Sequence, residues 1–216
     1  MENNGGSSSS SVLELILGPM YARKTWDLQA IALHYILRHL PILYIIFSDD
    51  KRYCSSELRP LNVSHDGTSI HAVRAKNFAQ DPPELTPDIK AVFVDEGQFF
   101  SHLGAFCQRM RSRGISVYIA GLNSDFHQKP WSNIMEVMPA LATKVTIKAA
   151  VCICCGDAAY CTRKIAGSKD VLVDTGADDK YVPTCFKCHS DEVPISQAVL
   201  DKRSAAVQRV KMMTSK

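Results

Sequence analysis

The 216-residue sequence has no long hydrophobic segment, no strong excess of charge and no internal repeat. No apolar run reaches the roughly 18 residues that a membrane-spanning helix needs, so we expect no membrane attachment. A formal net charge of +3 is too small to indicate nucleic-acid binding by itself. Residues 1–11 lack the basic start and apolar centre of a signal peptide. These absences predict a cytoplasmic protein that begins with a disordered leader.

The composition is that of an ordinary globular protein, with 46% hydrophobic and 22% charged residues. A chain of this length can hold one α/β domain and a smaller module. Without a secretion signal, the eight cysteines indicate metal binding or free thiols rather than a disulfide framework.

Apolar runs alternate with helical patterns along most of the chain. Helices are predicted from Thr25, where apolar residues recur at 3.6-residue spacing, and around Phe99 to Met110. Alternating strands and helices form βαβ units, which predicts an α/β fold with a parallel sheet and helices on both faces. The expected strands cover residues 12–17, 42–47, 70–73, 91–96, 115–122 and 145–151.

The composition changes at Cys152, where cysteines and short polar stretches replace the long apolar runs. The sequence therefore predicts four parts. They are the leader (1–11), a nucleotide-binding α/β domain (12–150), a small zinc-binding domain (151–192) and a basic tail (193–216).

The stretch from Leu13 to Thr25 has the layout of a phosphate-binding loop, with a strand, a turn at Gly18-Pro19 and then Lys24-Thr25, where the helical pattern begins. In such a loop, backbone N–H groups face the anion and the lysine reaches the terminal phosphates. A final hydroxyl, here Thr25, coordinates Mg²⁺. The loop residues are Gly18, Pro19, Met20, Tyr21, Ala22, Arg23, Lys24 and Thr25.

Arg23 stands where the phosphate-loop pattern has glycine, and it leaves an ordinary strand–turn–helix open as the alternative. Glycine is favoured where the backbone turns sharply against a phosphate. The arginine side chain either clashes there or points outward and leaves the loop usable.

Two carboxylates, Asp95 and Glu96, follow the apolar run at 91–94. In phosphate-loop enzymes one acid at this point helps to hold Mg²⁺, and a second accepts a proton from the attacking hydroxyl. The alternative is a pair of solvated loop acids, which the preceding buried strand and the phosphate loop disfavour.

Two C-x-x-C pairs lie near the end of the chain. In a cytosolic sequence this is the pattern of a tetrahedral structural zinc site. Four thiolates leave no open coordination position, so the metal is expected to be structural. Reduced core cysteines are the alternative, and Cys154 is a competing ligand. The predicted ligands are Cys152, Cys155, Cys185 and Cys188.

Together these residues resemble the thymidine kinase family of the human cytosolic, vaccinia and bacterial type, from about Val12 to Cys188. The most specific marker is Asp95-Glu96-Gly97-Gln98-Phe99-Phe100, followed by the double cysteine pairs. The resemblance implies transfer of the ATP γ-phosphate to the 5′-hydroxyl of thymidine, and of deoxyuridine, in dTMP salvage. It also implies Mg²⁺, a structural Zn²⁺ and a homo-oligomer, either a tetramer or a dimer.

The resemblance also assigns roles to individual residues. Glu96 matches the catalytic base, and Asp50, Arg52, Asp95 and Gln98 join the phosphate loop at the ATP phosphates. A lasso loop over 171–181 binds the base through its main chain. The nucleoside-binding positions are Met20, Phe99, Leu122, Phe126, Cys161, Val171, Val173, Thr175, Gly176 and Tyr181.

The sequence departs from the family pattern at Arg23, at residues 123–128 and at Cys161, where threonine is usual. Its lasso loop is one residue longer than usual, and the helix after the phosphate loop lacks paired arginines. These departures motivate a second hypothesis, a catalytically impaired homologue that acts as a structural or regulatory partner. A generic phosphate-loop ATPase is a third hypothesis, in which the lasso and zinc have no role.

Overall fold

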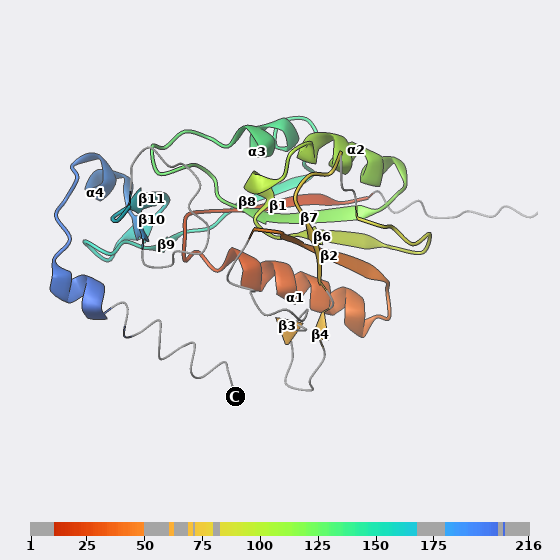
Figure 1. The fold of residues 1–216 in the computed structure, drawn as a ribbon, viewed down its shortest axis with the longest axis horizontal. Helices are drawn as coiled ribbons and strands as arrows, with labels where there is room; N and C mark the ends of the chain where they lie inside the picture. The colour runs from red at the N-terminus through yellow and green to blue at the C-terminus, as the bar shows by residue number, and fades with distance from the viewer. Residues whose placement is uncertain are drawn as a thin grey trace, which may run out of the picture. The chain divides into compact units, whose positions relative to one another are not determined.

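The computed structural model describes residues 11–49, 61–62, 69–70, 72–79, 83–167, 180–202 and 205. Within the chain, two compact units are distinguished (Figure 1). Unit 1 comprises residues 1–17, 24–121 and 131–146, and unit 2 comprises residues 18–23, 122–130 and 147–216. In the described part of the chain, no helix combines the length and the apolar character needed to cross a bilayer.

Unit 1 is built on a six-stranded sheet with the order β5-β2-β6-β7-β1-β8. The pairs β1–β7, β2–β5, β2–β6 and β6–β7 are all parallel, as the alternation of strands and helices predicts. The strands are β1 (Leu13–Leu17), β2 (Ile42–Phe47), β5 (Ala72–Ala75), β6 (Ala91–Val94), β7 (Ser116–Gly121) and β8 (Lys144–Ile147). A separate antiparallel pair joins β3 (Leu61–Asn62) to β4 (Ser69–Ile70).

Helices cover both faces of this sheet (Figure 1). On one face, α1 (Lys24–Leu37) buries Leu28 and Ala32 against Ile16, Tyr44 and Phe93. The other face is covered by α2 (Leu103–Ser112) and α3 (Ser132–Val137), together with the short 3₁₀ helix η2 (Gly97–Phe99). These observations confirm the predicted α/β fold with helices on both faces.

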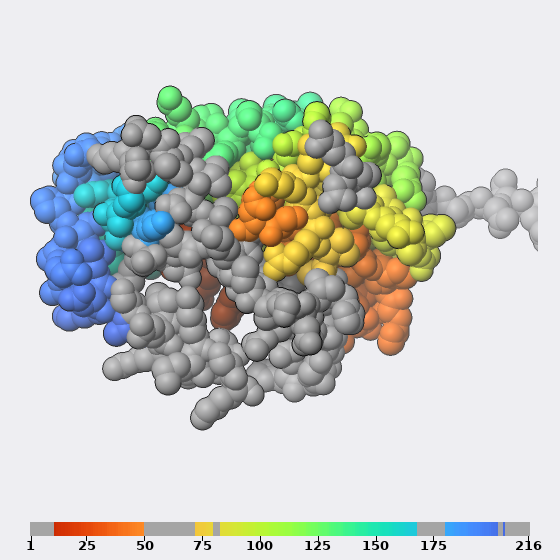
Figure 2. Space-filling model, in the orientation of Figure 1, coloured from red at the N-terminus to blue at the C-terminus, as the bar shows by residue number. Residues whose placement is uncertain are grey.

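Helices α2 and α3 lie directly against each other, and their surfaces adjoin in the space-filling view (green and yellow-green in Figure 2). The close approach occurs at Gly104, where an added Cβ would lie 3.3 Å from the Cβ of Glu136. The absence of a side chain at Gly104 therefore allows α3 to pack closely against α2.

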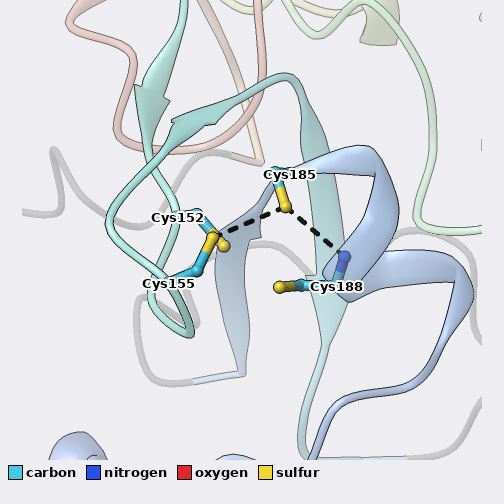
Figure 3. Close-up of side chains that lie close together, drawn as sticks. All are labelled: Cys152, Cys155, Cys185 and Cys188. Carbon is cyan, nitrogen blue, oxygen red and sulfur yellow. Dashed lines mark hydrogen bonds between the residues drawn. The ribbon is translucent and has the colours of Figure 1, made fainter.

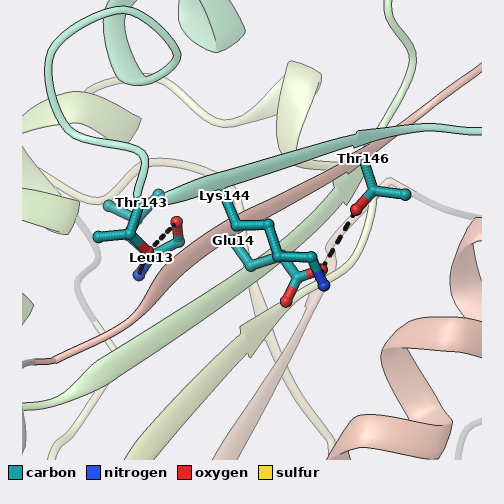
Figure 4. A network of polar contacts seen from close by, with 5 residues as sticks. All are labelled: Leu13, Glu14, Thr143, Lys144 and Thr146. Carbon is teal, nitrogen blue, oxygen red and sulfur yellow. Dashed lines mark hydrogen bonds and ion pairs between the residues drawn. The ribbon is translucent and has the colours of Figure 1, made fainter.

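Side chains attach β8 to β1 (Figure 4). The Thr143 hydroxyl accepts the Leu13 N–H at 2.9 Å and donates to the Leu13 carbonyl at 3.0 Å. Lys144 Nζ lies 2.7 Å from Glu14 Oε1, and the Thr146 hydroxyl donates to the same oxygen at 3.4 Å. Since Glu14 is only 8% exposed, these contacts supply partners to a carboxylate inside the sheet.

The described residues of unit 2 form two small antiparallel pairs, the short helix α4 and a helical stretch over 197–202. β9 (Ala150–Val151) pairs with β10 (Ala158–Ala159), and β11 (Cys161–Lys164) pairs with β12 (Tyr181–Thr184), which leads into α4 (Phe186–Ser190). The single strand predicted over 145–151 is wrong, because the chain divides there into β8 and β9, which belong to different sheets.

Candidate functional site

The two predicted acidic residues lie directly after β6 and are both buried, with Asp95 2% and Glu96 9% exposed. The hydroxyl of Thr25, in the first turn of α1, lies 3.1 Å from each carboxylate oxygen of Asp95. Asp95 also accepts the backbone N–H of Glu96 at 3.0 Å. A hydroxyl beside a carboxylate is a set of hard oxygen donors of the kind that Mg²⁺ takes.

Glu96 has a different environment from its neighbour. Its backbone is left-handed, with φ +56°, which is strained for a residue with a Cβ. Its carboxylate oxygen Oε2 accepts a hydrogen bond of 2.7 Å from Gln98 Nε2. The two carboxylates are thus held by different partners, which allows them different chemical roles.

The predicted phosphate loop divides between the units: residues 18–23 belong to unit 2, and Lys24 opens α1 in unit 1. Within unit 2, Gly18 lies so close to the backbone of Lys148 that an added Cβ would be 2.5 Å from the Lys148 carbonyl oxygen. The Met20 N–H donates to the Thr162 hydroxyl at 3.1 Å. Ala22 is buried with the cysteines of unit 2.

Tyr21 and Arg23 both have left-handed backbones, with φ +66° and +59°. Arg23 therefore adopts a conformation that glycine adopts more readily. Its side chain is exposed. The two outcomes considered for this residue, a clash with the phosphate or a usable loop, stay predictions.

Two predicted nucleoside-binding residues lie together in unit 2. The rings of Phe126 and Tyr181 have centroids 6.3 Å apart, and Lys164 Nζ lies 5.1 and 5.6 Å from them. Phe126 also lines a cavity of about 530 Å³ with His127, Arg163, Lys164, Ile165, His189, Glu192, Ile195 and Leu200. No sequence pattern indicates Lys164, because its place beside the two rings depends on the β11–β12 pairing.

The remaining predicted pocket residues are placed as follows. Leu122 and Cys161 are buried in unit 2. Phe99 belongs to unit 1, where its ring lies 5.2 Å from that of Phe47 and 5.7 Å from that of Trp131.

The divergent segment 123–128 is ordered by its own side chains. One carboxylate oxygen of Asp125 accepts the backbone N–H groups of His127 and Lys129, at 2.8 and 2.9 Å. Asn123 Nδ2 donates to the Tyr160 carbonyl at 3.1 Å. The side chains of Asp125 and Asn123 therefore both hydrogen-bond to backbone groups, within the segment or beside it.

The structure brings the four predicted metal ligands together, with their sulfur atoms all within 4.8 Å of one another (Figure 3). Cys155 and Cys185 Sγ are 3.7 Å apart. Sulfurs each about 2.3 Å from a tetrahedral zinc would be about 3.8 Å apart, so the cluster fits this ion. Cys154 is not one of the four.

Backbone geometry holds this cluster. Gly156, with φ +84°, allows the tight turn in which its N–H donates to the Cys152 carbonyl at 3.0 Å. Cys185 caps α4, and its sulfur accepts the Cys188 N–H at 3.4 Å. The Ile153 N–H donates to the Pro183 carbonyl at 3.0 Å and joins the two cysteine pairs.

The thiols of the cluster differ in how readily they ionise. Burial opposes ionisation of Cys152, but backbone hydrogen bonds at Cys185, Cys155 and Cys154 outweigh it and lower the pKa of this thiol to about 6. A backbone contact at Asp157 favours the Cys155 thiolate, but the Cys152 side chain and burial raise the pKa of Cys155 to about 11. A bound Zn²⁺ would replace the protons that these thiols share.

Comparison with known proteins identifies the family. The model of the thymidine kinase family matches residues 11–189. The chain belongs to the thymidine kinase family. The thymidine kinase of myxoma virus (strain Lausanne) is 32% identical over 177 residues, which cover 82% of this chain and 95% of the relative. That of vaccinia virus (strain Western Reserve) is 30% identical over 188 residues, which cover 87% of this chain and 99% of the relative.

Several positions that the family resemblance assigns lie outside the described residues. They are Asp50 and Arg52 at the phosphates, and Val171, Val173, Thr175 and Gly176 in the lasso loop. For this thymidine kinase family member, the described part of the candidate site therefore consists of three groups. They are the Thr25–Asp95–Glu96–Gln98 contacts in unit 1, and the 18–23 loop and the Phe126–Tyr181 pair in unit 2.

Proposed function

We propose that this protein is an ATP-dependent thymidine kinase that transfers the γ-phosphate to the 5′-hydroxyl of thymidine, and of deoxyuridine. Membership of the thymidine kinase family supports the reaction class. The observation that supports turnover most directly is the separate environment of Asp95 and Glu96, since phosphoryl transfer to a hydroxyl uses one acid at the metal and another as the base.

Thr25 and Asp95 would hold Mg²⁺, which neutralises charge on the transferred phosphate. Glu96 accepts the proton of the 5′-hydroxyl while that oxygen bonds to the γ-phosphorus. The bond from the γ-phosphorus to the β–γ bridging oxygen breaks, and ADP leaves. The loop over 18–25 is proposed to bind the triphosphate through its N–H groups and Lys24.

The nucleoside is proposed to bind among the aromatic and apolar residues of the predicted pocket and the main chain of the lasso loop. The cysteine cluster, loaded with Zn²⁺, would fix the base of that loop without taking part in the reaction. We also propose that the protein is cytoplasmic and forms a homo-oligomer. The hypothesis of an impaired partner protein is not favoured, because the contacts of Thr25, Asp95 and Glu96 are intact.

Steady-state kinetics of the purified protein with ATP, Mg²⁺ and thymidine test this function. Replacing Glu96 by Gln keeps the shape of the side chain and removes the base, so kcat should fall by about 10²- to 10⁴-fold. The exposed Glu84 provides the matched control, and Glu84→Gln should leave kcat unchanged. Wild-type turnover no higher than that of Glu96→Gln would exclude the proposed activity.

A further inference from the structure

We propose that Thr162 is a positioning residue for the phosphate loop, and that the part of this loop over 18–23 is held by the same small core as the cysteine cluster. Triphosphate binding then depends both on the Thr162 hydroxyl and on the loading of the cluster with Zn²⁺. This inference rests on the proposed function, in which the loop binds the triphosphate. It gives the metal site a role beyond the lasso loop.

The first observation is a hydrogen bond between β11 and the loop. The Met20 N–H donates to the Thr162 hydroxyl at 3.1 Å, although 142 positions separate the two residues in the chain. Thr162 is 4% exposed, so water competes little for this bond. The contact uses the backbone of Met20 and therefore fixes the path of the loop. The same N–H is engaged by the protein and is not one of those that receive a phosphate.

The second observation is that the loop forms a turn that lies against the backbone of unit 2. The Ala22 N–H donates to the Pro19 carbonyl at 3.4 Å and closes this turn. An added Cβ on Gly18 would lie 3.1 Å from Ala22 Cβ and 2.5 Å from the Lys148 carbonyl oxygen. Because there is so little space between them, a displacement of the backbone at Lys148 also displaces the turn.

The third observation is that Ala22 packs in the core that contains the cysteines. It is 2% exposed, and it belongs to the same buried cluster as Ala150, Ala159, Cys152 and Cys188. Two of these neighbours are predicted zinc ligands. Their positions, and with them the packing of Ala22, therefore depend on the metal.

These contacts have a consequence for nucleotide affinity. A loop that is already ordered before ATP arrives loses little conformational entropy on binding, whereas a loosened loop has to be ordered at that moment. Loss of the Thr162 contact or of the metal should therefore weaken ATP binding. The chemical step should change little, because neither Thr162 nor the cysteines touch the reacting groups in the proposed mechanism.

Replacing Thr162 by Val retains the shape of the side chain and removes the hydroxyl that accepts the Met20 N–H. We expect the Kd of a non-hydrolysable ATP analogue and the KM for ATP to rise by about 3- to 10-fold, as the loss of one hydrogen bond gives, with kcat nearly unchanged. Thr162→Ser keeps the acceptor and should restore both values. A loss of folded protein would instead lower kcat and leave KM unchanged.

Thr184→Val is the matched control. Thr184 lies on β12, the strand paired with β11, and is 0% exposed. Its hydroxyl has no hydrogen-bond partner among the described residues. The same substitution here removes a buried hydroxyl without removing a contact to the loop, so the KM for ATP should stay at the wild-type value. An equal rise in KM in Thr184→Val and Thr162→Val would overturn the inference.

Amide hydrogen exchange of the nucleotide-free protein tests the anchoring of the loop separately from the proposed function. In Thr162→Val the Met20 amide should exchange faster. After chelation of zinc, residues 20–23 should also exchange faster, by less than the segments that carry the cysteines, and the ATP analogue should bind more weakly.

Unchanged exchange of the Met20 amide and an unchanged KM for ATP in Thr162→Val would overturn the role of Thr162. Equal binding of the analogue with and without zinc would overturn the dependence on the metal. Wild-type protein in which Thr162 protects the Met20 amide but which does not bind the analogue would refute the proposed function, and with it the effect on ATP.

Discussion

At the scale of single residues, Arg23 has a left-handed backbone at the position where the phosphate-loop pattern has glycine. Its left-handed backbone costs a residue with a Cβ about 1–2 kcal/mol relative to the right-handed conformation. Its side chain is exposed, so the strain lies in the backbone and not in the packing of the side chain.

Replacing Arg23 by Gly should therefore maintain or raise stability, since the relief of strain exceeds the roughly 0.5–1 kcal/mol entropic cost of glycine. Replacing it by Val, whose branched Cβ suits this conformation least, should lower stability by about 1–2 kcal/mol. Urea unfolding measures both changes. Arg113, also exposed but with φ −92°, is the control, and Arg113→Gly should destabilise. Equal effects at positions 23 and 113 would contradict this account.

At the scale of elements, the junction of β1 and β8 combines buried and exposed polar contacts of unequal value. Thr143→Val removes both side-chain hydrogen bonds to Leu13, a residue with 0% exposure, and should cost about 1–3 kcal/mol because a buried N–H loses a partner. Lys144→Met leaves the Glu14 carboxylate, whose side chain is 10% exposed, without its ion pair, and should cost more than the at most about 1 kcal/mol of a surface ion pair. Denaturant titration of the two variants measures both losses, and a loss below about 1 kcal/mol in Lys144→Met would refute this account.

The sequence predicts most of the strands of unit 1 because their apolar runs are buried on both faces of a parallel sheet. It does not locate the break between β8 and β9, since no glycine or proline marks it. It also does not show that α2 begins only at Leu103, after η2 and a left-handed His102. The backbone conformation between η2 and α2 depends on how α2 packs against the rest of unit 1.

The same distinction holds for the candidate site. The four metal ligands can be predicted from the sequence, because the spacing of two C-x-x-C pairs is typical of a tetrahedral zinc site. The hydrogen bond between Gln98 and Glu96 cannot be predicted in this way, because it depends on the position of η2 beside Gly121. The sequence also does not show what Asp125 does in the divergent segment, where it accepts the backbone N–H groups of His127 and Lys129.

At the scale of the whole molecule, the chain forms two units with separate cores. Residues 18–23 and 122–130 cluster with residues 147–216, a grouping that a linear sequence does not reveal. The core of unit 2 is small and centres on Ala22, Ala150, Ala159 and the cysteines. A core of this size needs a covalent or metal cross-link, so we expect zinc to contribute much of its stability.

Removing the metal should therefore affect unit 2 more than unit 1. The purified protein should contain about one zinc ion per chain, and Cys185→Ser should reduce this several-fold. Cys154→Ser is the matched control and should retain the zinc. After chelation, amide hydrogen exchange should accelerate mainly in residues 150–164 and 181–193. Unchanged exchange there, or metal loss in Cys154→Ser, would contradict the assignment of the four ligands.

Under the proposed function, the position of Arg23 predicts how ATP binding depends on ionic strength. A glycine-containing loop attracts anions through fixed dipoles, whereas this loop adds a full charge that solvent reaches. Mobile counterions weaken the field of an exposed charge beyond about 8 Å at physiological ionic strength, and they weaken that of the largely buried Lys24 less. The affinity of this protein for a polyanionic ligand should therefore vary with ionic strength, and Arg23 should account for most of that variation.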